Sequence, residues 1–324
     1  MILAGIDIGT NSIRLLIAEI RSGAFREIYS ARRTTRLGKD LDCTGRLSPD
    51  AMERSFSVLS EFSVHIRNFP ACQTSAIGTS ALRNASNAHE FIAEVRRRTG
   101  IDVSVISGEE EARLTLLGVR SALQISENRG GYPPASTLVI DIGGGSTEFI
   151  VTNDRNETFV QSLPLGAVYL AERCITTDPP ALNELAALRQ VIRTELDRAE
   201  KSGPALPHGP GKRPDRFIGT AGTITTLAAM DQGMVVYDPA RINGSILTRV
   251  ALDRIVETLV SSTLLERRTM AGLEPGREDI ILPGAVIMQE IMERYAYPEM
   301  LISDWGLREG IVADLSVKLS QAPK

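Results

Sequence analysis

Two short glycine-containing segments have the composition of anion-binding loops. Residues 7–12 read Asp-Ile-Gly-Thr-Asn-Ser, and residues 141–146 read Asp-Ile-Gly-Gly-Gly-Ser. Glycine permits the backbone conformations and the close approach by which several N–H groups of one loop can point at an anion. A tight hairpin turn that needs glycine only for its geometry is the alternative. Because the pattern occurs twice, we favour anion binding, with Gly143, Gly144 and Gly145 as candidates.

Carboxylate side chains stand at the edges of both segments. Asp7 and Asp141 begin them, and Glu148 follows the second. Carboxylate oxygens are ligands for Mg²⁺, which can bridge the oxygens of bound phosphates. An aspartate beside a turn commonly accepts a local hydrogen bond instead. Taken together, the three carboxylates predict a magnesium site.

Three consecutive glutamates, Glu109, Glu110 and Glu111, open a predicted helix. The helix dipole favours acidic residues in a first turn, and Ser107 and Glu110 have the spacing of a capping box. This spacing gives Glu110 a structural role and leaves Glu111 as the freer carboxylate. Glu111 could therefore accept a proton from an attacking water molecule, as a general base does. Helix capping alone is the alternative.

Two further segments could contact phosphate. Arg83 follows a predicted strand, and its guanidinium could bind phosphate through two hydrogen bonds, although a solvated surface arginine is the alternative. Residues 219–223 lead from a predicted strand into a helix, where backbone N–H groups can contact an anion or nucleotide or simply form a turn. Arg308 and Glu309 are expected to form a buried structural ion pair.

The composition excludes several other classes of protein. The chain has 324 residues, of which 43% are hydrophobic and 23% charged, as expected for an ordered protein of two domains. Its net charge of −4 argues against general binding to DNA or to a membrane surface. No P-loop or dinucleotide motif is present, and the cysteines and histidines lack zinc-site spacing. The N-terminus has no signal-peptide pattern, so a cytoplasmic location is predicted.

The elements that must position these residues alternate between strands and helices. Each glycine-containing segment follows a short apolar run and precedes an alternating one, which predicts two β-hairpins and a duplicated domain. The composition of residues 126–134 indicates a linker. The predicted strands are 2–6, 13–17, 25–31, 74–77, 101–106, 138–140, 147–151, 217–218 and 300–303, and the main predicted helices are 49–66, 87–99, 108–123, 277–295 and one from about 307.

The duplicated hairpin segments resemble those of the actin, Hsp70 and sugar-kinase superfamily. The resemblance implies an α/β fold with two related actin-like (ribonuclease H-like) domains, each a mixed β-sheet flanked by helices, with the active-site cleft between them. Because the last helix of this superfamily returns to the first domain, the expected domain I comprises residues 1–124 and 306–324. The expected domain II comprises residues 125–305.

More narrowly, the chain resembles the exopolyphosphatase and guanosine-pentaphosphate phosphohydrolase (Ppx/GppA) family nearly from end to end. The segments that carry this resemblance are 7–12, 79–83, 107–113, 141–148, 162–167, 219–223 and 306–310. The resemblance implies that Glu111 activates water, with Glu110 as the alternative base, and that Asp141 and Glu148 hold Mg²⁺, while Asp7 stays a further metal candidate from its residue type. It also implies that the phosphates contact Asn11, Ser12, Arg83, Gly143, Gly144, Gly145 and Ser146.

The activity that this resemblance implies is phosphoanhydride hydrolysis. The expected substrate is inorganic polyphosphate, which loses terminal orthophosphate, or guanosine pentaphosphate (pppGpp), which becomes the stringent-response nucleotide ppGpp, or both. Mg²⁺ is the expected cofactor and K⁺ a further candidate. The chain is similar to short family members without extra helical domains, and a homodimer with no DNA or membrane partner is expected. The alternatives are an ATP-dependent small-molecule kinase of the same superfamily and a nucleotide-switched actin-like scaffold.

Overall fold

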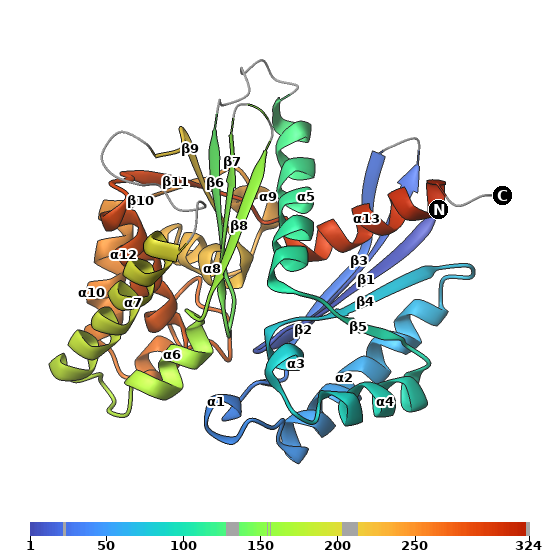
Figure 1. Cartoon of the computed structure of the whole chain (residues 1–324), viewed down its shortest axis with the longest axis horizontal. Coiled ribbons are helices and arrows are strands. Elements are labelled where there is room, and N and C mark those ends of the chain that lie inside the picture. The colour runs from blue at the N-terminus through green and yellow to red at the C-terminus, as the bar shows by residue number, and fades with distance from the viewer. Residues whose placement is uncertain (22–23, 128–135, 154, 156, 203–212, 322–324) are drawn as a thin grey trace. The chain divides into compact units, whose positions relative to one another are not determined.

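The computed structural model describes residues 1–324 except 22–23, 128–135, 154, 156, 203–212 and 322–324. The chain forms two compact units, each visible in Figure 1. Unit 1 contains residues 1–118 and 306–324, and unit 2 contains residues 119–305. The division falls within helix α5 (Gly108–Glu127), whereas the sequence placed it after residue 124. Most of the predicted linker at 126–134 lies outside the described residues.

The sheet of unit 1 is mixed, with a meander on one side and parallel strands on the other. Its five strands lie in the order β3-β2-β1-β4-β5. The first three are antiparallel neighbours, and β4 runs parallel to β1. The strands are β1 (Ile2–Ile8), β2 (Ser12–Arg21), β3 (Ala24–Thr34), β4 (Gln73–Gly78) and β5 (Val103–Val105).

Helices cover both faces of this sheet (Figure 1). On one face, Ile6 and Ile13 pack in a core with Phe62 and Phe91, and on the other, Leu3 packs with Val312. These two clusters follow from the alternation of side chains along a strand, because both faces of β1 and β2 are apolar. The helices are α1 (Leu41–Thr44), α2 (Pro49–Arg67), α3 (Ser80–Asn84), α4 (Ala88–Thr99), α5 and α13 (Leu307–Gln321).

The boundaries of the unit 1 helices agree with the capping signals in the sequence. The Ser48 hydroxyl accepts a hydrogen bond from the Ala51 N–H at 3.3 Å, and Pro49 occupies the first helical position of α2. Gly100 ends α4 with a φ of 75°, a conformation that favours glycine. The predicted helices 49–66 and 87–99 are therefore confirmed within a residue or two.

Helices α5 and α13 meet at glycine residues where their backbones touch. A Cβ atom at Gly118 would lie 2.0 Å from the Gly306 carbonyl oxygen, and one at Gly310 would lie 1.8 Å from the Leu114 carbonyl oxygen. Neither position can therefore hold a side chain without separating the helices. The two points at which the chain leaves and re-enters unit 1 are consequently in contact.

Unit 2 repeats the strand arrangement of unit 1 and adds one edge strand. Its order is β10-β11-β9-β6-β7-β8, in which β6, β7 and β8 form an antiparallel meander and β9 runs parallel to β6. The positions of β6 to β9 correspond to those of β1 to β4, so the predicted duplication is present in the fold. The strands are β6 (Thr137–Ile142), β7 (Thr147–Thr152), β8 (Thr158–Leu163), β9 (Arg216–Thr220), β10 (Ile246–Thr248) and β11 (Glu299–Ile302).

One large apolar core holds the helices of unit 2 against its sheet. Ile140 and Phe149 of the sheet lie in this core. Several helices contribute aliphatic side chains to it, among them Ile192 of α7, Leu227 of α8 and Ile287 of α12. Within the described residues, no helix combines the length and apolar character needed to cross a bilayer. The helices are α6 (Ala167–Cys174), α7 (Leu182–Ser202), α8 (Ala221–Asp231), α9 (Pro239–Ile242), α10 (Arg249–Ser261), α11 (Leu264–Arg267) and α12 (Ile281–Arg294).

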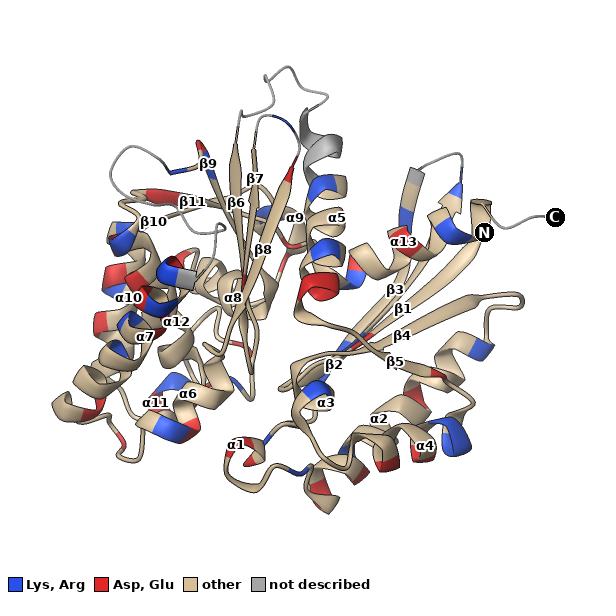
Figure 2. Cartoon of the chain, in the orientation of Figure 1, with Lys and Arg blue, Asp and Glu red and all other residues tan. Residues whose placement is uncertain are grey.

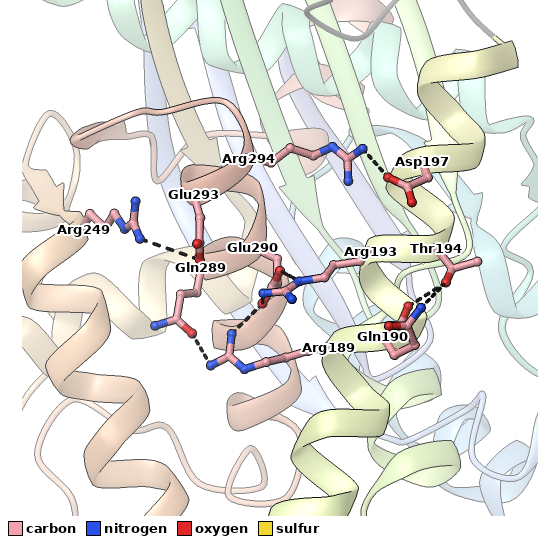
Figure 3. Close-up of polar contacts among 10 residues, drawn as sticks. All are labelled: Arg189, Gln190, Arg193, Thr194, Asp197, Arg249, Gln289, Glu290, Glu293 and Arg294. Atoms are coloured by element: carbon pink, nitrogen blue, oxygen red, sulfur yellow. Dashed lines mark hydrogen bonds and ion pairs between the residues drawn. The ribbon is translucent and has the colours of Figure 1, made fainter. Parts of the chain in front are cut away.

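A buried carboxylate joins α7 to α12. Glu290 of α12 is 3% exposed. It accepts hydrogen bonds from Arg189 Nη1 and from Arg193 Nε of α7, both at 2.6 Å (Figure 3). The two guanidinium groups satisfy both carboxylate oxygens, so the charge is compensated where the helices pack.

Two predicted elements differ from the structure. The helix expected from residue 277 begins at Ile281, because the Arg277 N–H bonds the Glu274 carbonyl in a turn at 3.2 Å. Its guanidinium also pairs with the Glu274 carboxylate at 2.9 Å. The strand expected at 101–106 is reduced to β5, an edge strand that pairs only with β4 among the described residues.

Candidate active site

The two glycine-containing segments form equivalent hairpin loops, one in each unit. In unit 1, the Gly9 N–H donates to the Ser12 carbonyl at 3.1 Å, and in unit 2, the Gly143 N–H donates to the Ser146 carbonyl at 2.9 Å. We call residues 9–12 loop 1 and residues 143–146 loop 2. The structure thus gives both sequence repeats the same backbone turn at the same place in the sheet.

A second segment of unit 1, residues 35–38, donates backbone hydrogen bonds to loop 1. The carbonyl of Thr10 accepts from the Gly38 N–H at 2.9 Å, and the carbonyl of Asn11 accepts from the Thr35 and Arg36 N–H groups at 3.1 and 2.9 Å. A Cβ at Gly38 would lie 2.4 Å from Thr10 Cγ2, so this close approach requires glycine. Loop 1 is therefore fixed through its carbonyl groups.

The first turn of α6 holds loop 2 in a similar way. The Gly143 carbonyl accepts from the Ala167 N–H at 3.0 Å, and the Gly144 carbonyl accepts from the Val168 N–H at 2.9 Å. A Cβ at Gly166 would lie 2.2 Å from the Gly144 oxygen. Gly166 and Ala167, at the end of the motif segment 162–167, therefore pack against the backbone of loop 2.

Asp141 and Glu148 lie opposite each other on neighbouring strands beside loop 2. They are direct partners in the β6–β7 register, so their side chains share one face of the sheet. This face is the one away from the core that contains Ile140 and Phe149. Both carboxylates are buried, and Glu148 Oε1 accepts hydrogen bonds from the Ser146 and Ser162 hydroxyls at 2.7 and 2.8 Å.

The chemistry of this pair of carboxylates fits the magnesium ion predicted from the sequence. Mg²⁺ is commonly held by one or two carboxylates and completes its shell with water and phosphate oxygens. Among the described residues, no cluster of three or more histidine, cysteine, aspartate or glutamate side chains could hold a metal alone. Asp7 lies beside loop 1 in unit 1, opposite Arg14, so its part in the predicted metal site stays a prediction.

At the start of α5, the adjacent side chains of Glu110 and Glu111 make different contacts. The Ser107 hydroxyl accepts from the Glu110 N–H at 3.2 Å, which is half of the predicted capping box. The Glu110 carboxylate does not complete that box in the described contacts, because it bonds Arg113 Nε and Nη2 at 2.7 and 2.8 Å. Its hydrogen bond and ion pair with Arg113 lower the pKa of Glu110. Figure 2 shows this acidic first turn in red on α5.

Glu111 contacts Arg83, the arginine predicted to bind phosphate. Arg83 Nη1 donates to Glu111 Oε2 at 2.8 Å and to the Ile106 carbonyl at 2.9 Å. Glu111 is 8% exposed. The predicted general base and the predicted phosphate-binding arginine are therefore direct partners, and Arg83 fixes the orientation of the carboxylate. Its other guanidinium nitrogens have no hydrogen-bond partner among the described residues.

Asn11 of loop 1 has the features expected of a ligand-binding amide. It is 8% exposed, and its Oδ1 and Nδ2 atoms have no hydrogen-bond partner among the described residues. Buried polar atoms are nearly always paired, so an exception needs an explanation. A bound phosphate, predicted here from the sequence, would supply an acceptor for Nδ2. Ser12, the neighbouring candidate, is also buried.

In each unit, a strand-to-helix turn lies beside the hairpin loop. The Thr79 N–H donates to the Ile8 carbonyl at 3.2 Å in unit 1, and Asp141 pairs with Thr220 in unit 2. The turn in unit 2 contains Ala221, whose φ of 68° is unusual for a residue other than glycine. The sequence of residues 219–223 predicts a turn or an anion contact, but nothing in it indicates this conformation.

Arg308 and Glu309 form the predicted ion pair at the start of α13. Arg308 Nε donates to Glu309 Oε1 at 2.8 Å, and Glu309 Oε2 accepts from the Gly306 N–H at 2.9 Å. Glu309 is 3% exposed, so the pair is buried on the carboxylate side. The hydrogen bond from the Gly306 N–H to Glu309 caps the start of α13, so the ion pair has a structural role.

The duplicated units, each with a mixed sheet and a hairpin loop, define the actin-like class of fold. The chain belongs to the Ppx/GppA phosphatase family, whose sequence model matches residues 16–319. It is 34% identical over 327 aligned positions to exopolyphosphatase 2 of Mycobacterium tuberculosis, covering 97% of this chain and 98% of that protein. It is 29% identical to exopolyphosphatase 1 of Mycobacterium leprae over 313 positions, covering 96% and 88%.

Solved structures agree with this assignment. A Ppx/GppA family member from Aquifex aeolicus has a TM-score of 0.80 at 34% identity and covers 99% of both chains. An exopolyphosphatase from Cytophaga hutchinsonii has a TM-score of 0.86 at 28% identity and covers 100% of this chain and 99% of that one. The fold class predicted from the duplicated hairpins is therefore confirmed.

Proposed function

We propose that this protein hydrolyses the terminal phosphoanhydride bond of inorganic polyphosphate and releases orthophosphate. The observation that carries the proposal is the buried Glu111 held by Arg83 in unit 1. The full-length similarity to proteins named exopolyphosphatases supports it. A hydrolase needs a base for water and positive charge for phosphate, and this pair offers both groups within 2.8 Å.

In the proposed reaction, Glu111 accepts a proton from water as the water oxygen attacks the terminal phosphorus. The bond between that phosphorus and the bridging oxygen breaks, and the electron pair stays with the shortened polyphosphate. In unit 1, loop 1 and the guanidinium nitrogens of Arg83 that have no partner among the described residues bind phosphoryl oxygens, where negative charge is concentrated. Loop 2 of unit 2 would likewise bind phosphate through its backbone. Asp141 and Glu148 would hold Mg²⁺, which neutralises phosphate charge when bound.

Guanosine pentaphosphate is the second proposed substrate. It carries the same terminal phosphoanhydride, and it is the second substrate that the resemblance of the sequence implies. The same residues would act on it, since the chemistry is confined to the terminal phosphoryl group. Which of the two substrates is preferred depends on the groups that contact the remainder of the molecule.

The test measures orthophosphate release, with Mg²⁺ present, from tripolyphosphate, long-chain polyphosphate and guanosine pentaphosphate. Glu111→Gln should lower kcat at least ~100-fold, because the amide cannot accept the proton. It can still accept the hydrogen bond of Arg83, so the variant should fold. The matched control is Glu110→Gln, whose side chain contacts Arg113 instead.

The outcomes separate the proposal from its alternatives. Release that disappears in Glu111→Gln and persists in Glu110→Gln supports the hydrolase and its base. Loss only in Glu110→Gln would assign the base to the neighbouring residue. No release from any of the three substrates would contradict the hydrolase, and phosphate transfer from ATP to an acceptor, or nucleotide-dependent assembly, would then identify a kinase or a scaffold.

A further inference from the structure

Two neighbouring buried side chains in unit 1 leave three polar atoms without a hydrogen-bond partner among the described residues. These atoms are Oδ1 and Nδ2 of Asn11 and Oγ1 of Thr35. Thr35 is fully buried and lies outside every motif that the sequence analysis singled out. Because unpaired buried polar atoms are costly, three of them together require a common explanation.

The backbones of Asn11 and Thr35 adjoin at the end of the β2–β3 ladder. The β2–β3 ladder ends at the pair Ser12 and Thr34, and Asn11 and Thr35 are the residues immediately beyond it. The Thr35 and Arg36 N–H groups both donate to the Asn11 carbonyl, at 3.1 and 2.9 Å, so the two residues are held next to each other. Rotation of the Asn11 amide about its terminal side-chain bond can therefore bring Oδ1 within reach of the Thr35 hydroxyl.

We propose that Thr35 is a positioning residue that orients the amide of Asn11 toward phosphate, an inference that rests on the proposed function. In the substrate complex, Asn11 Nδ2 donates to a phosphoryl oxygen, and the Thr35 hydroxyl donates to Asn11 Oδ1. All three atoms then have partners. Without the Thr35 hydroxyl, the Asn11 amide can rotate so that Oδ1, in place of Nδ2, faces the phosphate. The amide oxygen and the phosphate oxygens are both acceptors and repel each other.

The test compares Thr35→Val with the unsubstituted protein, using tripolyphosphate as the substrate. Valine has the shape of threonine without the hydroxyl. KM should rise about 3- to 10-fold, the equivalent of one hydrogen bond. The kcat value should be unchanged, because the Asn11 contact serves bound substrate and transition state alike. The melting temperature should be equal or higher, since the hydroxyl has no partner among the described residues of the unliganded protein.

Two further variants distinguish positioning from a structural role. Thr35→Ser keeps the hydroxyl and should restore KM toward its original value. In an Asn11→Ala background, Thr35→Val should have no further effect on KM, because the amide that it orients is gone. Thr226→Val is the control for stability: Thr226 is equally buried, but its hydroxyl donates to the Gly222 carbonyl at 2.6 Å, so this variant should melt at a lower temperature.

Failure of this inference and failure of the proposed function give different results. If the unsubstituted protein hydrolyses tripolyphosphate and Thr35→Val leaves KM unchanged, the positioning role is wrong and the function stands. A raised KM with a lowered melting temperature, not rescued by serine, would also overturn it in favour of a structural role. If the unsubstituted protein neither hydrolyses nor binds tripolyphosphate, both the function and this inference are wrong.

Discussion

Gly166 offers a direct test of how loop 2 is held. Its backbone φ of −106° is ordinary, so alanine would meet no conformational strain there. The difficulty is contact, because the new Cβ would lie 2.2 Å from the Gly144 carbonyl oxygen and 2.4 Å from the carbonyl carbons of Gly144 and Gly145. An acceptable separation is about 3.2 Å or more, so loop 2 or the start of α6 must move by about 1 Å.

We therefore expect Gly166→Ala to lower kcat/KM for tripolyphosphate about 100-fold, since a ~1 Å misplacement of a binding group has an effect of that order. The loss corresponds to about 2.7 kcal/mol of transition-state stabilisation. The free energy of unfolding should fall by ~1–3 kcal/mol through overpacking. Orthophosphate release measures kcat/KM, and denaturant unfolding of the same protein sample measures the free energy of unfolding.

Gly100→Ala is the matched control for this substitution. Gly100 has a φ of 75° and open space around its Cβ position, so alanine there costs stability by strain, about 1–2 kcal/mol, without pushing on a loop. Its kcat/KM should be unchanged. A Gly166→Ala protein that is folded and fully active would refute the argument that loop 2 must keep this position.

Two predictions concern stability. Hydrogen bonds from the hydroxyls and N–H groups of Thr176 and Thr177, and from the Ala181 N–H, lower the pKa of Glu184 to about 2 from an ordinary 4.5. Its contribution is therefore complete above pH 4.5 and is lost as the pH falls toward 2, so the melting temperatures of Glu184→Gln and the unsubstituted protein should converge over that range. Replacing Glu290 with Gln should lower the free energy of unfolding by about 1.5–3 kcal/mol in chemical denaturation, because the bonds from Arg189 and Arg193 lose their charged acceptor. An unchanged midpoint would contradict that reading of the α7–α12 contact.

The parts of the fold that could be predicted are those encoded within a short stretch of sequence. Helix α2 shows its N-cap, its proline and its apolar period in one segment, and the two hairpin loops repeat one pattern. The start of α12 was missed because Arg277, which looks helical in sequence, bonds Glu274 in a preceding turn. The position of Arg277 in this turn depends on burial of its ion pair with Glu274, and no local sequence pattern reveals that burial.

The candidate site was predictable in its residue types and not in its contacts. Glu111 and Arg83 were each singled out, but their ion pair joins separate elements and cannot be deduced from spacing. Thr35 gave no signal in the sequence, because its hydroxyl stands out only by having no partner among the described residues of the fold. Segment 162–167 carries the family resemblance but does not indicate that Gly166 packs against loop 2. The metal ions, the homodimer and the phosphate contacts of Ser12 and Ser146 stay predictions.

The contact between Gly118 and Gly306 has a consequence for synthesis of the chain. Since these residues touch, unit 2 is an insertion within unit 1 whose two ends emerge side by side. Helix α13, which covers Leu3 on one face of the unit 1 sheet, is translated only after the whole of unit 2. That apolar face therefore stays uncovered on the ribosome until unit 2 has been made. Folding of unit 2 would bring residue 306 back to residue 118 and reduce the entropy cost of closing unit 1.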